Sequence, residues 1–143
     1  MEQRKEDVGT KKDLMLYRLE NAKSDLKSAK ILYEAEEYKA ANNRAYYAIF
    51  HSLNAVHALS GSAYKRHKDA IGSFNKDYVK TGIFPREIGR KIGEAEEIRH
   101  ASDYDDFYIA SKEESEHQIA VAEEFIQLIE EYCIIQIEKE GTP

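Results

Sequence analysis

The scarcity of helix-breaking residues constrains this sequence more than any other feature. Its 143 residues contain two prolines, Pro85 and Pro143, and seven glycines. A sandwich or barrel of β-strands needs many turns, and turns use glycine and proline more often than this chain does. Proline also interrupts helices, so its near absence permits long ones. The composition therefore favours an all-α fold.

Apolar residues recur at three- and four-residue steps, which places them on one side of a helix with 3.6 residues per turn. The predicted helices cover residues 13–35, 38–60, 69–80, 85–100 and 111–139. Residues 1–12 are polar, include Gly9, and are expected to form a flexible leader. The expected architecture is one antiparallel up-and-down bundle of four to five helices over residues 13–140.

Residues typical of helix ends support these limits. Gly61 follows the second predicted helix, where a left-handed C-cap is expected. Pro85 is expected at the first position of the fourth helix. Ser111, with Glu114 three residues later, forms the pattern of a capping box before the last helix.

The second predicted helix has two apolar faces, which is unusual for a surface helix. At about 100° per residue, small residues form one stripe and bulky residues form another on the opposite side. The small stripe contains Ala41, Ala45, Ala48, Ser52, Ala55 and Leu59, and the bulky stripe contains Tyr46, Phe50 and Leu53. A helix buried on both sides is expected at the centre of the bundle, with a close helix neighbour on the small stripe.

The net charge of −6 conceals an uneven distribution. Residues 62–91 carry eight basic and three acidic groups, whereas residues 92–143 carry three and fifteen. A polyanionic ligand such as RNA is therefore compatible with this acidic chain, because the middle segment is locally basic. The single cysteine, Cys133, excludes an internal disulfide framework. No apolar run approaches the roughly 20 residues of a membrane span, and a cytoplasmic location is expected.

Two groups of residues are candidates for chemistry. Arg99 falls among the inward positions of the fourth helix, where an apolar residue is expected, and it needs a partner such as Asp103 or Tyr104. That partner could be purely architectural, pinning the loop before the last helix. Arg44 and His51 lie two turns apart on nearly one line of the second helix, with Tyr47 between them. Arginine can hold a phosphate and histidine can move a proton near neutral pH, although an ordinary structural role also fits these two residues.

Other patterns are weaker. Two Glu-x-x-His matches, Glu97 with His100 and Glu114 with His117, resemble di-iron ligands, but helical spacing turns them away from the apolar faces, so solvent-exposed positions and no metal are expected. Lys65 and Arg66 belong to a short basic loop that is either ordinary solvated charge or part of a binding surface. No phosphate-binding glycine loop or nucleophile motif is recognisable, and no cofactor is expected.

The second helix and the segment after Arg99 together resemble a known family. Residues 43–51 read NRAYYAIFH, and Arg99 is followed at 103–107 by DYDDF and then by the capped last helix. This order of motifs is similar to that of the HEPN (higher eukaryote and prokaryote nucleotide-binding) family, and in particular to its small stand-alone prokaryotic members. The resemblance covers about residues 13–131 and implies a helical bundle that forms a homodimer.

The resemblance also implies a function. Many such proteins pair with a minimal nucleotidyltransferase in toxin–antitoxin systems, and the active members are metal-independent endoribonucleases. They use an Arg and a His with four to six residues between them, usually close to the start of the last long helix. At that place this sequence has Arg99, and Asp103 or Tyr104 takes the His position. Arg44 and His51, with six residues between them, fit this spacing but lie in the second helix. Related systems modify a nearby tyrosine with AMP, which implies Tyr104 or Tyr108 here.

The leading hypothesis is a dimeric HEPN-type protein of a prokaryotic toxin–antitoxin or defence system, which in its catalytic form cleaves RNA through Arg44, His51 and Arg99. The candidate binding residues are Tyr47, Lys65, Arg66, Asp103 and Tyr104. An alternative is a non-catalytic module that binds a nucleotide or a nucleotidyltransferase partner, and a purely structural interaction domain is a third. In the catalytic hypothesis the arginines stabilise charge on the phosphate, and His51 transfers a proton as the 2′-hydroxyl of the RNA attacks.

Overall fold

The structure is a computed structural model that describes residues 2–140, with side chains from Thr10 to Glu140. Within these residues it contains helices and no β-strand, as predicted. The helices are α1 (Glu2–Glu34), α2 (Tyr38–Ser60), α3 (His67–Phe74), the π-helical segment η1 (Asn75–Val79), α4 (Arg86–Tyr104) and α5 (Lys112–Glu140). None of these helices is long and apolar enough to cross a membrane.

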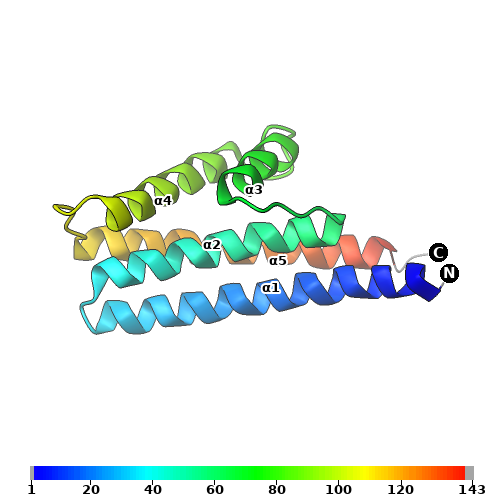
Figure 1. Cartoon of the computed structure of the whole chain (residues 1–143), viewed down its shortest axis with the longest axis horizontal. Coiled ribbons are helices and arrows are strands. Elements are labelled where there is room, and N and C mark those ends of the chain that lie inside the picture. The colour runs from blue at the N-terminus through cyan, green and yellow to red at the C-terminus, as the bar shows by residue number, and fades with distance from the viewer. Residues whose placement is uncertain (1, 141–143) are drawn as a thin grey trace.

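Helix α2 is the central element of the bundle, as its two apolar faces predicted. It packs against α1, α3, α4 and α5, and its most extensive contact is with α1. Helices α1, α2 and α5 run along the length of the molecule, while α3 and α4 cover one side of this layer (Figure 1). Every residue of the small stripe from Ala41 to Ala55 is buried, and so are the three bulky residues opposite. Small side chains permit the close approach of neighbouring helices.

Helix α1 extends further than the sequence predicted. Residues 2–12 continue the helix, so the structure differs from the flexible leader expected there. A single glycine in a helix costs about 1 kcal/mol, and this stretch contains no proline. The packed part of α1, anchored by Met15, Leu19 and Ala22, can therefore be prolonged by Gly9 and its polar neighbours.

The ends of α2 and α5 follow the predicted signals. Gly61 adopts a left-handed conformation with φ of 83°, and its backbone N–H donates to the carbonyl of Ala58. The backbone N–H of Glu114 donates to Ser111 Oγ at 3.0 Å, which is one half of the predicted capping box. The Glu114 side chain accepts hydrogen bonds from Tyr108 and Asn42. The sequence predicted a solvent-exposed position for Glu114 as part of a Glu-x-x-His match. The structure instead shows that its carboxylate is hydrogen-bonded to two other side chains.

The middle of the chain differs in detail from the prediction. The third helix begins at His67, two residues earlier than expected, and ends in the π-helical turn η1. Pro85 precedes α4 as its N-cap, and the helix begins at Arg86. Helix α4 also runs to Tyr104, past the predicted end at His100, so the first four residues of the predicted connection, 101–104, are helical. The Asp-rich sequence permitted either form, because local side-chain hydrogen bonds compete with the helix.

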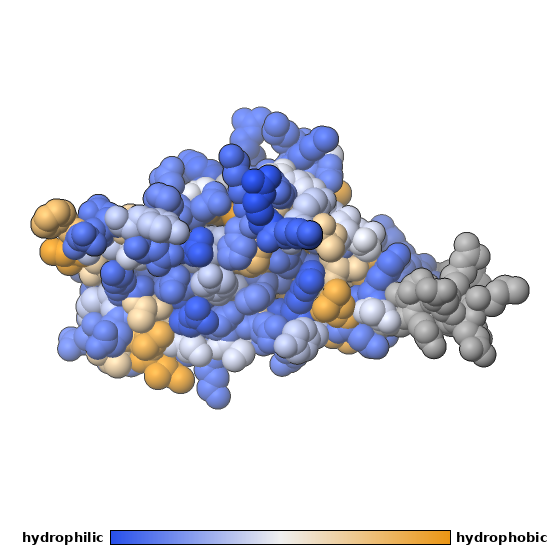
Figure 2. Space-filling model, viewed as in Figure 1, coloured by the Kyte–Doolittle hydropathy of each residue, from blue (hydrophilic) through white to orange (hydrophobic). Residues whose placement is uncertain are grey.

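The connection between α4 and α5 exposes two large apolar side chains at one end of the bundle. Phe107 and Ile109 are 92% and 87% exposed. Figure 2 shows apolar surface at the end of the molecule where this connection lies in Figure 1. The core itself lies between the helices and includes Phe74, Phe84, Ile88, Ile92 and Phe125.

Candidate functional site

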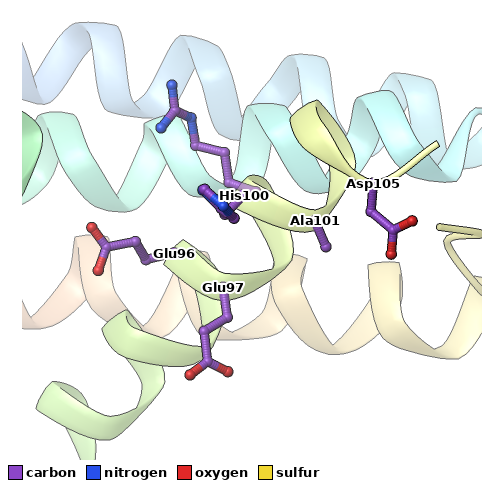
Figure 3. A pocket seen from close by; sticks show the side chains of 6 residues that line it. Glu96, Glu97, His100, Ala101 and Asp105 are labelled. Carbon is purple, nitrogen blue, oxygen red and sulfur yellow. The ribbon is translucent and has the colours of Figure 1, made fainter. Parts of the chain in front are cut away.

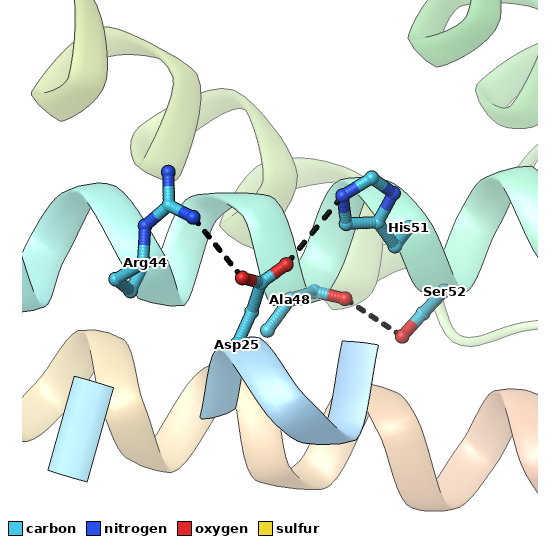
Figure 4. A network of polar contacts seen from close by, with 5 residues as sticks. All are labelled: Asp25, Arg44, Ala48, His51 and Ser52. Atoms are coloured by element: carbon cyan, nitrogen blue, oxygen red, sulfur yellow. Dashed lines mark hydrogen bonds and ion pairs between the residues drawn. The ribbon is translucent and has the colours of Figure 1, made fainter. Parts of the chain in front are cut away.

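One carboxylate from α1 joins the two candidate residues of α2. Asp25 Oδ1 accepts a hydrogen bond from Arg44 Nη1 at 3.1 Å, and Asp25 Oδ2 lies 3.5 Å from His51 Nε2. Figure 4 shows the carboxylate between the two side chains and beside Ala48. The small side chain at position 48 leaves room for Asp25, so the small stripe of α2 also shapes this network.

The surroundings of His51 keep its imidazole neutral at pH 7. Burial lowers its pKa, and the nearby positive charges of Arg18 and Arg44 lower it further, whereas Asp25 opposes the shift. A neutral imidazole can accept a proton, and a neighbouring carboxylate stabilises the imidazolium that results. The arrangement of His51 and Asp25 therefore suits a general base.

Arg99 reaches the same region from α4. Its Nη2 donates to Tyr47 Oη at 3.3 Å, and its Nε lies 3.7 Å from Asp103 Oδ2. The guanidinium also lies 5.0 Å from the centre of the Tyr46 ring, a cation–π distance. Burial lowers the pKa of Arg99, but its contacts with Tyr47, Tyr46 and Asp103 raise it overall, so the side chain stays charged. Its Nε is buried without a hydrogen-bond partner among the described residues.

Tyr47 brings these residues together. The Arg44 guanidinium lies 4.8 Å from the centre of its ring, that of Arg99 lies 5.6 Å away, and the His51 ring centre lies 6.0 Å away. Helices α2 and α4 therefore place Arg44, His51 and Arg99 around one tyrosine. Two guanidinium groups beside an imidazole can hold a phosphodiester and move a proton to or from it.

A second histidine, which the sequence did not single out, borders this cluster. His67 is the first residue of α3, and its Nδ1 forms a 2.9 Å hydrogen bond with Tyr46 Oη. Its ring stacks on Phe50 with 3.8 Å between ring centres. Sequence inspection took His67 only as part of the basic loop around Lys65 and Arg66. We name Arg44, His51, His67 and Arg99 the Arg/His cluster.

The remaining predicted residues of α4 divide between two faces. Asp103 belongs to the site because it lies one helical turn after Arg99 and forms an ion pair with it. Among the described residues, Tyr104 makes no hydrogen bond, ion pair or ring contact with the Arg/His cluster. Its side chain is 74% exposed, and its ring packs against His100. Of the two expected partners of Arg99, the structure therefore brings Asp103 to it and not Tyr104. Since α4 continues through Tyr104, five residues after Arg99 correspond to about 140° around the helix.

Tyr108 has an architectural setting. Its hydroxyl donates to Glu114 and accepts a hydrogen bond from Asn42 Nδ2 at 3.3 Å. Burial raises the pKa of Tyr108 to about 12, and the contact with Glu114 adds to the rise. The three residues join the connection before α5 to α2 and α5.

Lys65 and Arg66 are exposed in the connection before α3, directly before His67 in the chain. Arg66 forms an ion pair of 3.0 Å with Asp69. Lys65 and Arg66 lie near the Arg/His cluster because they directly precede His67 in the sequence. Their role in binding stays a prediction.

An open pocket of about 520 Å³ lies along α4 and includes Arg99 in its wall. The other lining residues are Glu96, Glu97, His100, Ala101 and Asp105, which Figure 3 shows on the last turns of α4 and just beyond. Three carboxylates in this wall disfavour an RNA phosphate.

The two Glu-x-x-His matches do not form a metal site. Glu97, His100 and His117 are exposed, and His117 lies 3.6 Å from Glu94. Among the residues whose side chains are described, no three His, Cys, Asp or Glu residues are grouped in a way that could hold a metal ion.

Comparison with known proteins places the chain in a wider group. Residues 15–132 match the model of the HEPN domain. A UPF0332 protein of Thermotoga maritima is 31% identical over 86% of this chain and 93% of its own length. A protein of Methanocaldococcus jannaschii named "Putative toxin MJ0605" is 36% identical over 78% of this chain and 82% of its own length. Another protein from that organism, named "Putative toxin MJ0142", is 29% identical over 81% of this chain and 79% of its own length.

Proposed function

Because this chain belongs to the HEPN domain family, we propose that it is a toxin-like protein that cleaves RNA without a metal ion. The observation that carries this proposal is the convergence of Arg44, His51 and Arg99 around Tyr47. The names of the two archaeal relatives support the toxin-like role. The proposal extends to a prokaryotic toxin–antitoxin or defence setting and to a cytoplasmic location.

The chemistry follows from the groups present. Arg44 and Arg99 bind the scissile phosphate and stabilise the charge that builds up on it in the transition state. His51, oriented by Asp25, takes the proton of the 2′-hydroxyl as this oxygen attacks the phosphorus. The products then end in a 2′,3′-cyclic phosphate and a 5′-hydroxyl.

Cleavage of RNA in EDTA tests this proposal. We expect the purified protein to cut single-stranded or structured RNA with EDTA present and to leave 2′,3′-cyclic phosphate ends. His51→Ala and Arg99→Ala should each lower the rate by about 100-fold or more, because each removes a group that acts in the transition state. Arg90→Ala is the matched control, since Arg90 is exposed on α4 and lies about 180° around the helix from Arg99. Cleavage that survives both site substitutions would contradict the assignment.

A non-catalytic binding module is the second candidate. Asp103 or Tyr104 stands where a family nuclease would carry its histidine, and Asp103 is paired with Arg99, which favours this alternative. Such a protein would bind a nucleotide or a nucleotidyltransferase partner through the basic segment that includes Lys65 and Arg66. Absence of RNA cleavage together with saturable nucleotide binding would support it.

The proposed partnership with a nucleotidyltransferase leads to a prediction about modification. Tyr104 is 74% exposed, whereas the Tyr108 hydroxyl is held by Glu114 and Asn42. We therefore expect AMP to be attached to Tyr104 when the protein is produced with such an enzyme. Mass spectrometry of proteolytic fragments checks this, with Tyr104→Phe and Tyr108→Phe compared. Loss of the added mass in Tyr108→Phe alone would contradict it.

The proposal also includes a homodimer, as in related proteins. Sedimentation equilibrium at several protein concentrations measures the oligomeric state directly. A monomer at the concentrations at which the protein cuts RNA would remove the dimer from the proposal.

A further inference from the structure

The position of His67 is unusual for a residue at the start of a short helix. Its ring is stacked between the chain's own aromatic groups, parallel to Phe50 within 22° and with the edge of Tyr47 5.8 Å away, centre to centre. Tyr46 Oη engages Nδ1. No hydrogen bond to Nε2 is present among the described residues, so this nitrogen can serve a ligand.

The fold holds His67 in this place through several contacts. Helix α3 is attached to α2 by His57, whose Nε2 lies 2.9 Å from the carbonyl oxygen of Ala70. His57 itself is 1% exposed. A buried hydrogen bond of this kind orders the first turns of α3 against α2. This bond lies one turn after His67 and helps to hold the start of α3 beside α2.

The charged groups around His67 differ from those around His51. Tyr46, Tyr47 and His51 face it from α2, and Arg99 faces it from α4. Burial lowers the pKa of His67, and the charge of Arg99 lowers it further, followed by that of His51. In its own helix, Asp69 is already paired with Arg66.

These surroundings suit the two histidines to opposite tasks. A carboxylate beside His51 stabilises its imidazolium form and so favours acceptance of a proton. An arginine beside His67 makes its imidazolium a stronger acid, which favours donation of a proton. Cleavage of a phosphodiester by an internal 2′-hydroxyl needs one group of each kind.

We propose that His67 is a second catalytic residue of this site, acting as the general acid while His51 acts as the general base. The inference rests on the proposed RNA-cleaving function. As the 2′-oxygen–phosphorus bond forms, the 2′-hydroxyl proton passes to His51. As the phosphorus–5′-oxygen bond breaks, His67 Nε2 gives its proton to the departing 5′-oxygen. One proton is taken and one is given, so exchange with solvent returns both histidines to their starting states.

Tyr46 acts as a positioning residue in this proposal. Its hydroxyl accepts a hydrogen bond from Nδ1–H of the imidazolium, which directs Nε2 away from Tyr46. Burial raises the pKa of Tyr46 to about 12, so the hydroxyl stays neutral throughout the reaction. Tyr46→Phe keeps the ring and removes this hydrogen bond.

A change of leaving group tests the role of His67 separately from folding and binding. The probe is an oligoribonucleotide that the wild-type protein cuts in EDTA, made with either oxygen or sulfur as the bridging 5′-atom at the cut site. A thiolate leaves without prior protonation, because thiols are far stronger acids than alcohols. We expect His67→Ala to lower the rate on the oxygen substrate by about 100-fold or more, and on the sulfur substrate by less than about tenfold.

Three other variants complete the test. His51→Ala should lower the rate on both substrates, since the base acts before the leaving group departs. His117→Ala should leave both rates unchanged, because this exposed histidine lies on α5 and pairs with Glu94. His67→Gln repeats the test with a polar side chain of similar size. The helical signal in circular dichroism checks that each variant is folded. If His67→Ala does not fold, the rates of His67→Gln on the two substrates decide the test.

The outcomes separate the two proposals. A folded His67 variant that loses the same factor on both substrates, or loses nothing, overturns the general-acid assignment and leaves the proposed function standing. A wild-type protein that cuts no RNA overturns the proposed function and the assignment with it. Selective recovery on the sulfur substrate supports both.

Discussion

Asp25 connects two of the four members of the Arg/His cluster, Arg44 and His51. It is the only carboxylate within 4 Å of both Arg44 and His51 among the described residues, and its side chain is 16% exposed. Neutralising one cation and orienting one imidazole are different tasks, and a single carboxylate can perform both because it has two oxygens. In the first helix the sequence identified only the apolar face, and it gave no signal that Asp25 would reach Arg44 and His51.

Replacing this carboxylate should change the titration of His51 in a defined direction. Asp25 raises the pKa of His51 against the effect of burial. We therefore expect Asp25→Asn to lower the pKa of His51 further, as measured by NMR titration of the imidazole Cε1–H. Stability should fall by about 1 kcal/mol or less, because the ion pair with Arg44 is partly exposed. Asp69→Asn, which removes the exposed partner of Arg66, is the control, and a raised pKa of His51 in Asp25→Asn would refute this role.

At the scale of elements, the end of α2 sets where α3 begins. Gly61 stops the helix in a left-handed conformation, and the chain returns through residues 62–66 to place His67 beside Phe50. A residue with a Cβ is strained at φ of 83°. The left-handed turn at Gly61 therefore helps to determine that His67 lies in the Arg/His cluster.

Gly61→Ala should reveal this strain. We expect a loss of about 1–2 kcal/mol in the free energy of unfolding, measured with urea. An added Cβ would also lie 3.0 Å from Lys11 Cε, a flexible side chain that can move. The matched control is Gly72→Ala in α3, where an added Cβ meets nothing within 4 Å, and where alanine should stabilise the helix by up to about 1 kcal/mol. Equal effects of the two substitutions would argue against the conformational explanation.

At the scale of the whole molecule, three histidines connect folding to pH. Burial is the largest cause of a lowered pKa in His51, His57 and His67. The unfolded chain, where histidine has its ordinary pKa of about 6.5, therefore binds more protons than the folded chain just below that pH. The free energy of unfolding then falls as the pH falls. At about pH 7.5, one unit above that pKa, nearly all copies of the three side chains are neutral in both states, and they contribute little pH dependence.

This linkage predicts a loss of stability on mild acidification. Urea unfolding should give a nearly constant free energy between about pH 7.5 and 8.0 and a declining one below about pH 6.5. His57 is expected to contribute most to this decline, because it is 1% exposed. While it stays neutral in the folded chain, it lowers the free energy of unfolding by up to about 1.4 kcal/mol per pH unit. His57→Gln keeps an N–H donor for the Ala70 carbonyl and cannot titrate, so its decline should be shallower. His117→Gln should retain the wild-type slope, and an identical slope for His57→Gln would contradict the prediction.

Much of the fold could be predicted because its determinants are local. The spacing of Met15, Leu19 and Ala22 in α1, or of Ile88, Ile92 and Ala95 in α4, identifies a buried face without knowledge of its partner. Gly61 and Ser111 mark helix ends through the backbone of their own neighbours. The limits of α3 and α4 were less accurate, because a π-helical turn and an Asp-rich helix end depend on small energy differences.

The sequence by itself determined the all-α class, the central helix with its two apolar faces, and Arg44, His51 and Arg99 as candidates. Only the tertiary structure decided that Asp25 and His67 join them and that Tyr104 does not. The physical reason is that helical periodicity assigns a residue to a face of its own helix. Which faces meet depends on how α1, α3 and α4 pack around α2, and that packing is set by contacts between residues far apart in the chain.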